Sequence, residues 1–197
     1  PSINSGVGII WAFSQAHPDF GFSVSVFSNM GDKKTADIHD TRFGEDYFIV
    51  SEGDAWMEKL SQTMAWAIEN GVDPYNHLYT HPQLSKTDNA GIVFELKEND
   101  RVTRYYLSKI GRDDLIPQLG NMIALPYGEW PSTERGINLL KEYKNSEGEP
   151  VQAIFEAYNL AYNEQKMTLS IFSDGFDRYK MARIMATVGS VNWVVEQ

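Results

Sequence analysis

The strongest constraint in the sequence is a helical stripe of apolar residues between Asp54 and Gly71. Apolar side chains recur there at steps of three and four residues, at Trp56, Met57, Leu60, Met64, Ala67 and Ile68. Gly53 or Asp54 can cap the start, and Asn70-Gly71 is a typical helix end. Because a one-sided apolar helix must be covered by a second layer, the pattern predicts a helix over 54–70 packed on a sheet.

Two segments before this helix have the composition of strands. Residues 7–14 form a short apolar run with β-branched and aromatic side chains, which suits a strand buried on both faces. Residues 20–28 alternate apolar with small side chains and follow the turn signal His17-Pro18-Asp19. The short break between them predicts an antiparallel hairpin, and residues 47–50 predict one more short strand.

The rest of the chain predicts further alternation of helices and strands. Residues 71–90 read as a polar connection, and residues 92–97 and 102–109 read as a second hairpin. Helices are predicted over 132–143, 150–164 and 177–188, the second with Pro150 in its first turn and the third capped by Asp177. Strands over 167–172 and 191–195 would then be joined through a helix, which implies a parallel, right-handed crossover.

These elements predict an α/β (or α+β) fold with a mixed β-sheet flanked by helices. The N-terminal side would hold antiparallel hairpins, and the C-terminal part would be βαβ-like. A length of 197 residues suits a single globular domain over 1–197, with an irregular excursion around 111–131 in which a short helix from Asp113 could form.

Charge and composition narrow the classes of function. The chain has 17 Lys and Arg against 27 Asp and Glu, a net charge of −10, which disfavours unspecific binding to nucleic acid or to an anionic membrane surface. With 0 Cys, disulfides, thiolate nucleophiles and Cys-type metal sites are excluded. The apolar run at 7–13 is too short to span a membrane and has no basic flank. We therefore expect a cytoplasmic protein; a mature secreted form stays open.

The negative charge is concentrated in the first half of the chain. Residues 1–100 hold 15 acidic and 6 basic side chains, while residues 101–197 hold 12 and 11. A concentrated field selects partners by sign, so an acidic face for a basic protein is one interpretation, and a solubilising surface is the other. The candidate contacts are Asp37, Asp40, Glu45 and Asp46, joined by the aromatic side chains of Tyr105, Tyr106 and Trp130.

Two short strings could instead bind a metal ion. His77, His81 and Asp88 supply imidazoles and a carboxylate, and their string is similar to the His-x-His-Pro, Ser, Asp pattern of JAMM-type metallopeptidases, with three residues between the histidines instead of one. Asp174 lies in Ser-Asp-Gly-Phe-Asp, which resembles the metal-binding loop near the end of von Willebrand factor A domains. The first apolar run lacks that family's Asp-x-Ser-x-Ser.

Two functions from different classes follow. The preferred one is a non-enzymatic acidic binding protein: an inhibitor or immunity-type partner of a basic protein, or a subunit of a larger assembly, without a cofactor and with homo-oligomers possible. The alternative is a divalent-metal-dependent hydrolase with its site at Asp174 or at His77, His81 and Asp88. The most specific enzyme signals, a phosphate-binding Walker loop, a G-x-G-x-x-G fingerprint and a G-x-S-x-G elbow, do not occur in the sequence.

Overall fold

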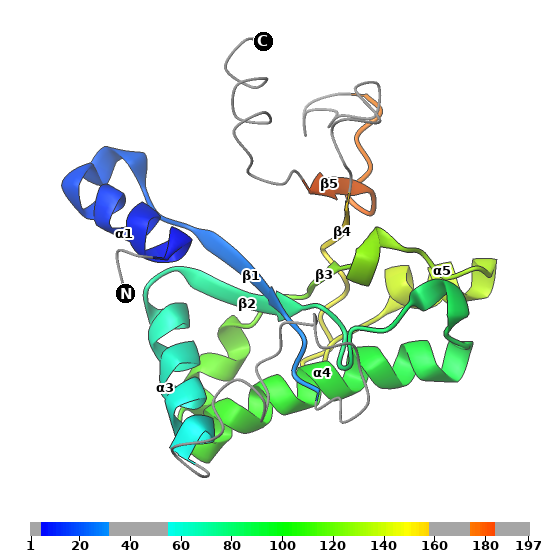
Figure 1. The fold of residues 1–197 in the computed structure, drawn as a ribbon, viewed down its shortest axis with the longest axis horizontal. Coiled ribbons are helices and arrows are strands. Elements are labelled where there is room, and N and C mark those ends of the chain that lie inside the picture. Colours follow the sequence, from blue (N-terminus) through cyan, green and yellow to red (C-terminus); the bar gives the residue numbers. More distant parts are fainter. Residues whose placement is uncertain (1–4, 32–54, 158–173, 184–197) are drawn as a thin grey trace.

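A single parallel sheet organises the chain. The computed structural model describes residues 5–31, 55–157 and 174–183 (Figure 1). Its strands are β1 (Val24–Ser28), β2 (Val72–Asn76), β3 (Met122–Ala124), β4 (Ala153–Ala157) and β5 (Met181–Arg183). They lie in the order β1-β2-β3-β4-β5, and every neighbouring pair is parallel. Their carboxyl ends therefore point in the same direction and form one edge of the sheet.

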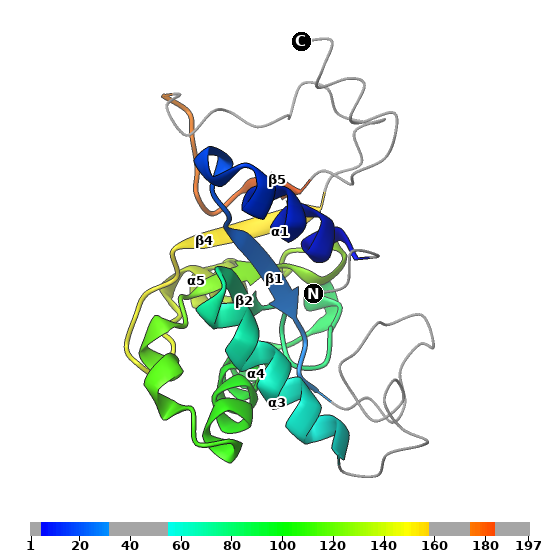
Figure 2. The same ribbon diagram turned by 90° about the vertical axis from the view of Figure 1, so that its left-hand side faces the viewer.

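Three α-helices connect β1 to β2, β2 to β3 and β3 to β4, in this order: α3 (Ala55–Glu69), α4 (Asn89–Lys109) and α5 (Glu134–Glu142). They lie on one side of the strands, and α1 (Gly6–Ala16) lies on the other side (Figures 1 and 2). A sequential strand order with crossovers of one hand requires this one-sided arrangement. Short 3-10 turns complete the described elements: η1 (Pro18–Phe20), η2 (Leu84–Lys86), η3 (Asp113–Gln118) and η4 (Pro126–Gly128).

The helix side of the sheet contains two apolar cores. One joins α3, α4 and η3 through Leu60, Met64, Ile68, Val102, Leu107 and Leu115, with Met30 packed against them. The other joins α4, α5, β3 and β4 through Ile92, Leu96, Ile123, Leu140 and Ile154, all of which are almost completely buried. Burying such side chains contributes about 1.5–3 kcal/mol each, so these contacts hold the helices onto the strands.

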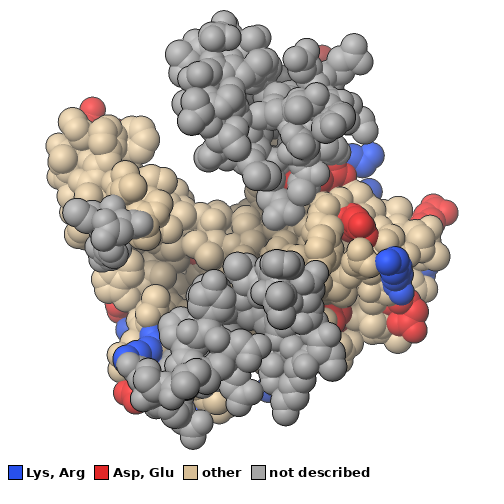
Figure 3. Space-filling view, viewed as in Figure 1, with Lys and Arg blue, Asp and Glu red and all other residues tan. Residues whose placement is uncertain are grey.

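The opposite face of the strands, which we call the inner face, is aromatic and concave. The ring of Phe27 on β1 lies 5.5 Å from Tyr75 on β2 and 5.1 Å from Phe155 on β4. Neighbouring strands are about 4.8 Å apart, so rings three strands apart could not touch across a flat sheet. The strands therefore curve around this face. On the side of the molecule shown in Figure 3, most of the described atoms beside α1 belong to uncharged residues.

The predicted antiparallel hairpins are wrong. Residues 7–14 belong to helix α1 instead of a strand, because Ser5 caps that helix with its hydroxyl accepting from the Gly8 N–H at 3.0 Å. An apolar run of this length is compatible with a strand or a helix by periodicity alone. Part of the predicted strand at 20–28 is confirmed as β1, but its partner is β2, in parallel.

The second predicted hairpin is also wrong, since residues 92–97 and 102–109 lie in the single helix α4. The segment 98–101, read as a turn, supports the helix instead. The Glu98 carboxylate accepts from Arg101 three residues on, and Asp100 accepts from Arg104 four residues on at 2.9 Å. Side chains three or four residues apart are neighbours only in a helix.

Strand β2 lies inside the segment predicted to be a polar connection, and Pro74 explains the error. Proline lacks the N–H that a central strand needs. At the two ends of β2, the backbone hydrogen bonds to β1 are made by Gly71 and His77. Both are odd-numbered, so the odd-numbered residues between them also direct their backbone N–H and C=O groups toward β1. Pro74 faces β3, and the pairing of β2 with β3 starts only at Asn76. The missing N–H therefore breaks no ladder bond.

The C-terminal predictions are confirmed only in part. Helices 54–70 and 132–143 are confirmed as α3 and α5, and the excursion 111–131 contains η3 and β3. The helix predicted over 150–164 is wrong where it is described, because 153–157 form β4 between β3 and β5. The helix over 177–188 is wrong likewise, because 181–183 form β5. The strands predicted at 47–50, 167–172 and 191–195 lie outside the described residues.

Candidate functional site

The loops after β1, β2 and β3 meet at the carboxyl edge of the sheet. In parallel sheets with sequential strands, ligands bind at this edge, because loops and strand-end side chains converge there. The backbone of Gly31, after β1, donates to the Tyr79 carbonyl, after β2, at 2.6 Å. A Cβ atom on Gly31 would lie 2.3 Å from that oxygen, so only glycine permits the approach.

His77 is the first residue after β2 and is fixed on two sides. Its backbone N–H donates to the Ser28 carbonyl at 3.1 Å, which continues the β1–β2 ladder past the end of the strand. Its ring Nδ1 lies 2.7 Å from the carbonyl oxygen of Ala124 at the end of β3. A carbonyl oxygen only accepts, so Nδ1 carries the proton and Nε2 is the acceptor nitrogen of the neutral ring.

His81 and Tyr127 continue an aromatic row from His77. The ring of His81 lies 4.7 Å from that of His77 and 4.6 Å from that of Tyr127, in edge-to-face arrangements. His77 and His81 are half-buried, and Tyr127 is 50% exposed. We call His77, His81 and Tyr127 the imidazole site. The site places two imidazoles, the side-chain group best suited to proton exchange near neutral pH, beside one exposed aromatic ring.

Backbone strain is concentrated at this site. Among the described residues, the non-glycine positions with positive φ are Leu78 at 62°, His81 at 56° and Tyr127 at 55°. All three lie in the loops that form or adjoin the imidazole site. Such conformations cost about 1–3 kcal/mol each and persist where surrounding contacts enforce them, commonly at ligand sites.

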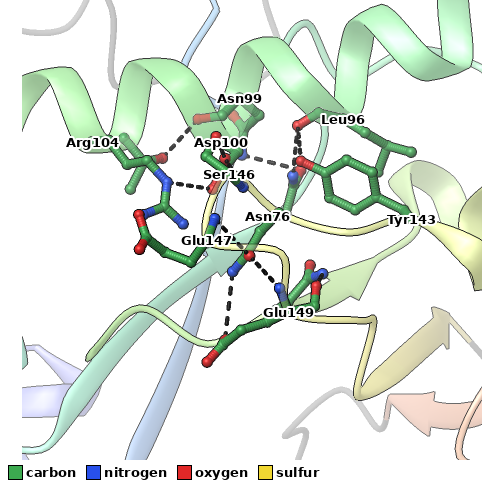
Figure 4. Close-up of polar contacts among 12 residues, drawn as sticks. Asn76, Leu96, Asn99, Asp100, Arg104, Tyr143, Ser146, Glu147 and Glu149 are labelled. Atoms are coloured by element: carbon green, nitrogen blue, oxygen red, sulfur yellow. Dashed lines mark hydrogen bonds and ion pairs between the residues drawn. The ribbon is translucent and has the colours of Figure 1, made fainter. Parts of the chain in front are cut away.

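Buried side chains of α4 hold these loops in place (Figure 4). The Asn99 side chain accepts from the Met30 N–H at 2.7 Å and donates to the Ser28 carbonyl and to Asn76 Oδ1 at 3.0 and 3.1 Å. Asn76 in turn donates to the Leu96 carbonyl at 3.0 Å. One turn before Asn99 on the helix, the Glu95 carboxylate accepts from both the backbone and the hydroxyl of Thr80, which fixes the loop before His81.

A second polar cluster, next to Asn99 on α4, fastens this helix to the loop before β4 (Figure 4). Arg104 is 8% exposed and pairs with Asp100 at 2.9 Å and with Glu147 at 3.0 Å. Asp100 also accepts from the backbone N–H of Ser146 at 3.0 Å (Figure 4). Each of these side chains is used to connect helix and loop, so the cluster stabilises the fold.

The predicted metal ligands come together only in part. His77 and His81 are neighbours, but Asp88 is exposed and caps α4, its carboxylate accepting from the Gly91 N–H at 2.7 Å. Asp174 is exposed in a turn. Within residues 5–31, 55–157 and 174–183, no three His, Asp or Glu side chains are grouped so that they could hold a metal ion. The metal hypothesis stays a prediction.

The predicted protein contacts divide in the same way. Tyr105 is 48% exposed, but Tyr106 is only 7% exposed and packs in the α3–α4 core, so its prediction as an exposed contact is wrong. Trp130 is half-buried, and its indole N–H donates to the carboxylate of Glu156, which is buried. The acidic candidates Asp37, Asp40, Glu45 and Asp46 lie outside the described residues.

No family model, curated protein or solved structure matches this chain. In the part of the chain that the structure describes, no helix is both long and apolar enough to cross a membrane.

Proposed function

We propose that the chain binds a small polar molecule at the carboxyl edge of its sheet and exchanges a proton with it through His77 and His81. The observation that carries this proposal is the pair of imidazole rings, 4.7 Å apart, at the end of β2. Two histidines in a strained loop at the ligand-binding edge of a parallel sheet are a typical arrangement for acid–base chemistry.

His77 is the candidate general base. Its ring is oriented by the Ala124 carbonyl at 2.7 Å, which assigns the proton to Nδ1 and the acceptor lone pair to Nε2. An imidazole held in one tautomer by a backbone carbonyl needs no reorganisation before it accepts a proton, which is the role of the orienting group in acid–base sites.

His81 and Tyr127 complete the proposed site. The edge-to-face contact of His81 with His77 couples their charges, because two imidazolium rings this close would repel each other. The pair therefore disfavours the state in which both rings are charged, so protonation of one ring opposes protonation of the other. Tyr127, exposed and in contact with His81, offers an aromatic surface against which a ligand can pack.

The proposal differs from the acidic binding protein expected from the charge distribution. That hypothesis depends on Asp37, Asp40, Glu45 and Asp46, which lie outside the described residues, and it remains a prediction. The alternative function, a divalent-metal-dependent hydrolase with its site at Asp174 or at His77, His81 and Asp88, also remains a prediction.

Saturation-transfer NMR with four probes tests the proposal: acetate, inorganic phosphate, glucose and adenosine. We expect at least one probe to bind the wild type, and His77→Gln or His81→Gln to weaken that binding at least tenfold. His17→Gln is the matched control, because His17 is exposed and lies beside Phe13 at the end of α1, away from the carboxyl edge. Binding that survives both site substitutions, or no binding of any probe, would falsify the proposal.

A further inference from the structure

Asn29 lies at the carboxyl edge and its side chain belongs to the inner face. Its neighbours on both sides belong to the helix side: Met30 packs into the α3–α4 core, and Ser28 pairs in register with Asn76, whose side chain reaches α4. Successive residues of an extended chain alternate between faces, so Asn29 is directed opposite to Ser28 and Met30.

The register places Asn29 beside His77. Phe27 is paired with Tyr75, and their rings lie 5.5 Å apart on the inner face. The ladder continues one step further, because the His77 N–H donates to the Ser28 carbonyl at 3.1 Å. Two residues beyond Phe27 and Tyr75, Asn29 and His77 therefore occupy adjacent positions on the same face, about one strand spacing of 4.8 Å apart.

The side-chain amide of Asn29 is buried, and its Nδ2 donor is unused. The residue is 4% exposed, and its Nδ2 has no hydrogen-bond partner in the structure described. Asn99, which is buried and bonds the backbone of the residues on either side of Asn29, uses both its side-chain oxygen and its side-chain nitrogen in hydrogen bonds. An unsatisfied buried donor costs folding free energy, and in native proteins it is usually explained by a water, an ion or a ligand.

We propose that Asn29 is a ligand-binding residue, its Nδ2 donating a hydrogen bond to a carbonyl-type oxygen of the molecule bound at His77. This inference rests on the proposed function and specifies the ligand: a small molecule with a carboxylate or amide oxygen placed between Asn29 and His77. An amide donor aimed at that oxygen stabilises negative charge on it while the imidazole accepts a proton from the same molecule or from water.

The test uses the full chain labelled with nitrogen-15, and three probes of similar size: acetate, acetamide and methylammonium. The first two carry the carbonyl-type oxygen, and the third has no acceptor. We expect acetate or acetamide to shift both the Asn29 side-chain amide signal and the His77 ring signals, and methylammonium to shift neither.

Asn29→Asp replaces the donor by an acceptor at constant size and should weaken binding of the active probe at least tenfold. Asn29→Ser provides a second variant in case the aspartate impairs folding, and its backbone amide spectrum verifies the native structure. Asn89→Asp, at the exposed start of α4, is the matched control and should bind like the wild type.

The outcomes separate the two proposals. A probe that shifts His77 and His81 and binds the Asn29 variants with unchanged affinity overturns the role of Asn29 and leaves the imidazole site intact. Binding of methylammonium at Asn29 also overturns it, because an acceptor would then be needed there. If neither acetate nor acetamide shifts His77 or His81 while phosphate, glucose or adenosine does, this inference fails and the proposed function stands; if none of the probes of either set shifts them, both fail.

Discussion

Phe27 on β1 and Phe155 on β4 are in ring contact at 5.1 Å, although β2 and β3 lie between their strands in the sheet. Only a strongly curved sheet brings these side chains together. At the carboxyl edge of the same sheet the loops after β1, β2 and β3 meet, through the Gly31 N–H donating to the Tyr79 carbonyl at 2.6 Å and the ring contact of His81 with Tyr127 at 4.6 Å.

A double-mutant cycle measures this contact. We expect Phe27→Leu and Phe155→Leu to be coupled by about 0.5–1.5 kcal/mol in the free energy of unfolding, as aromatic pairs in contact are. The control pairs Phe27→Leu with Phe94→Leu, because Phe94 is 54% exposed on α4. Chemical denaturation of the single and double variants gives the coupling. Equal, near-zero coupling in both cycles would mean that the sheet is not curved in this way.

Asn99 should be the most costly asparagine to remove among the described residues of α4. Asn99→Ala leaves the Met30 N–H, the Ser28 carbonyl and Asn76 without their partner, and we expect a loss of about 1–3 kcal/mol in unfolding free energy. Asn89→Ala, on the same helix but exposed, should change it by about 0.5 kcal/mol or less. Similar losses for the two variants in urea titrations would contradict the role of Asn99 as the link between loops.

Arg104 and Arg101 provide a matched comparison of buried and exposed ion pairs. The Arg104 side chain is 10% exposed and serves two carboxylates, whereas that of Arg101 is 62% exposed and serves Glu98. Arg104→Ala should cost about 3 kcal/mol, because it leaves Asp100, whose side chain is only 12% exposed, without its cation. Arg101→Ala should cost about 0.5 kcal/mol. Thermal unfolding would contradict the account if both variants melted at the same temperature.

Asp73 makes the stability of the fold depend on pH. It lies on the inner face, and burial raises its pKa above the ordinary value of 3.8. The folded state therefore favours the protonated carboxyl, so the wild type loses stability relative to Asp73→Asn as pH rises from below 3.8 through the raised pKa. Above that pH the difference should stay constant. Urea unfolding of both proteins across the acid range measures it, and a difference that does not change with pH would refute the burial of this carboxyl.

The same substitution should also act on Tyr75. Burial raises the pKa of the Tyr75 phenol, and the negative charge of Asp73 raises it further. Asp73→Asn removes the second cause, so the Tyr75 pKa should fall. Ultraviolet titration of the phenol in the wild type and the variant follows this change, with Tyr75→Phe identifying the signal. An unchanged titration midpoint would show that the two inner-face residues do not interact.

Local signals were sufficient for two helices. The apolar stripe and the glycine stop of 54–70 predict α3, and Gly71 ends it with a φ of 77°. Helix α5 is capped by Thr133, whose hydroxyl accepts from the Gly136 N–H at 3.0 Å. The apolar periodicity and the capping residues of each helix lie within a short stretch of sequence. Both helices can therefore be predicted without knowledge of distant contacts.

The strands could not be predicted in the same way, because their identity depends on neighbours far away in sequence. The segment around Ile154 has helical spacing of apolar residues, yet it becomes a strand because β3 and β5 pair with it on both sides. In β2, Pro74 predicts an interruption of the strand from sequence alone. The register shows that its backbone nitrogen faces the β3 side, where β2 has no paired residue before Asn76. Tertiary pairing overrides local propensity in both cases.

Part of the imidazole site was visible in the sequence. The His77 and His81 pair stood out by residue type, although Asp88 has a capping role in the structure. Asn29 was missed, because a single asparagine after a short strand carries no chemical pattern. Its significance comes from burial, from an unused donor and from a register with His77 that only the parallel pairing of β1 with β2 creates.

The most direct test of the imidazole site is a long-range proton–nitrogen spectrum of the histidine rings, recorded at a pH where they are neutral. The signals that vanish in His77→Gln should show a protonated Nδ1 and an unprotonated Nε2, because the Ala124 carbonyl accepts from Nδ1. Those signals and the ones lost in His81→Gln should respond together to the bound probe, while the signals of His17 stay fixed. A His77 ring protonated on Nε2, with no response to any probe, would contradict the account.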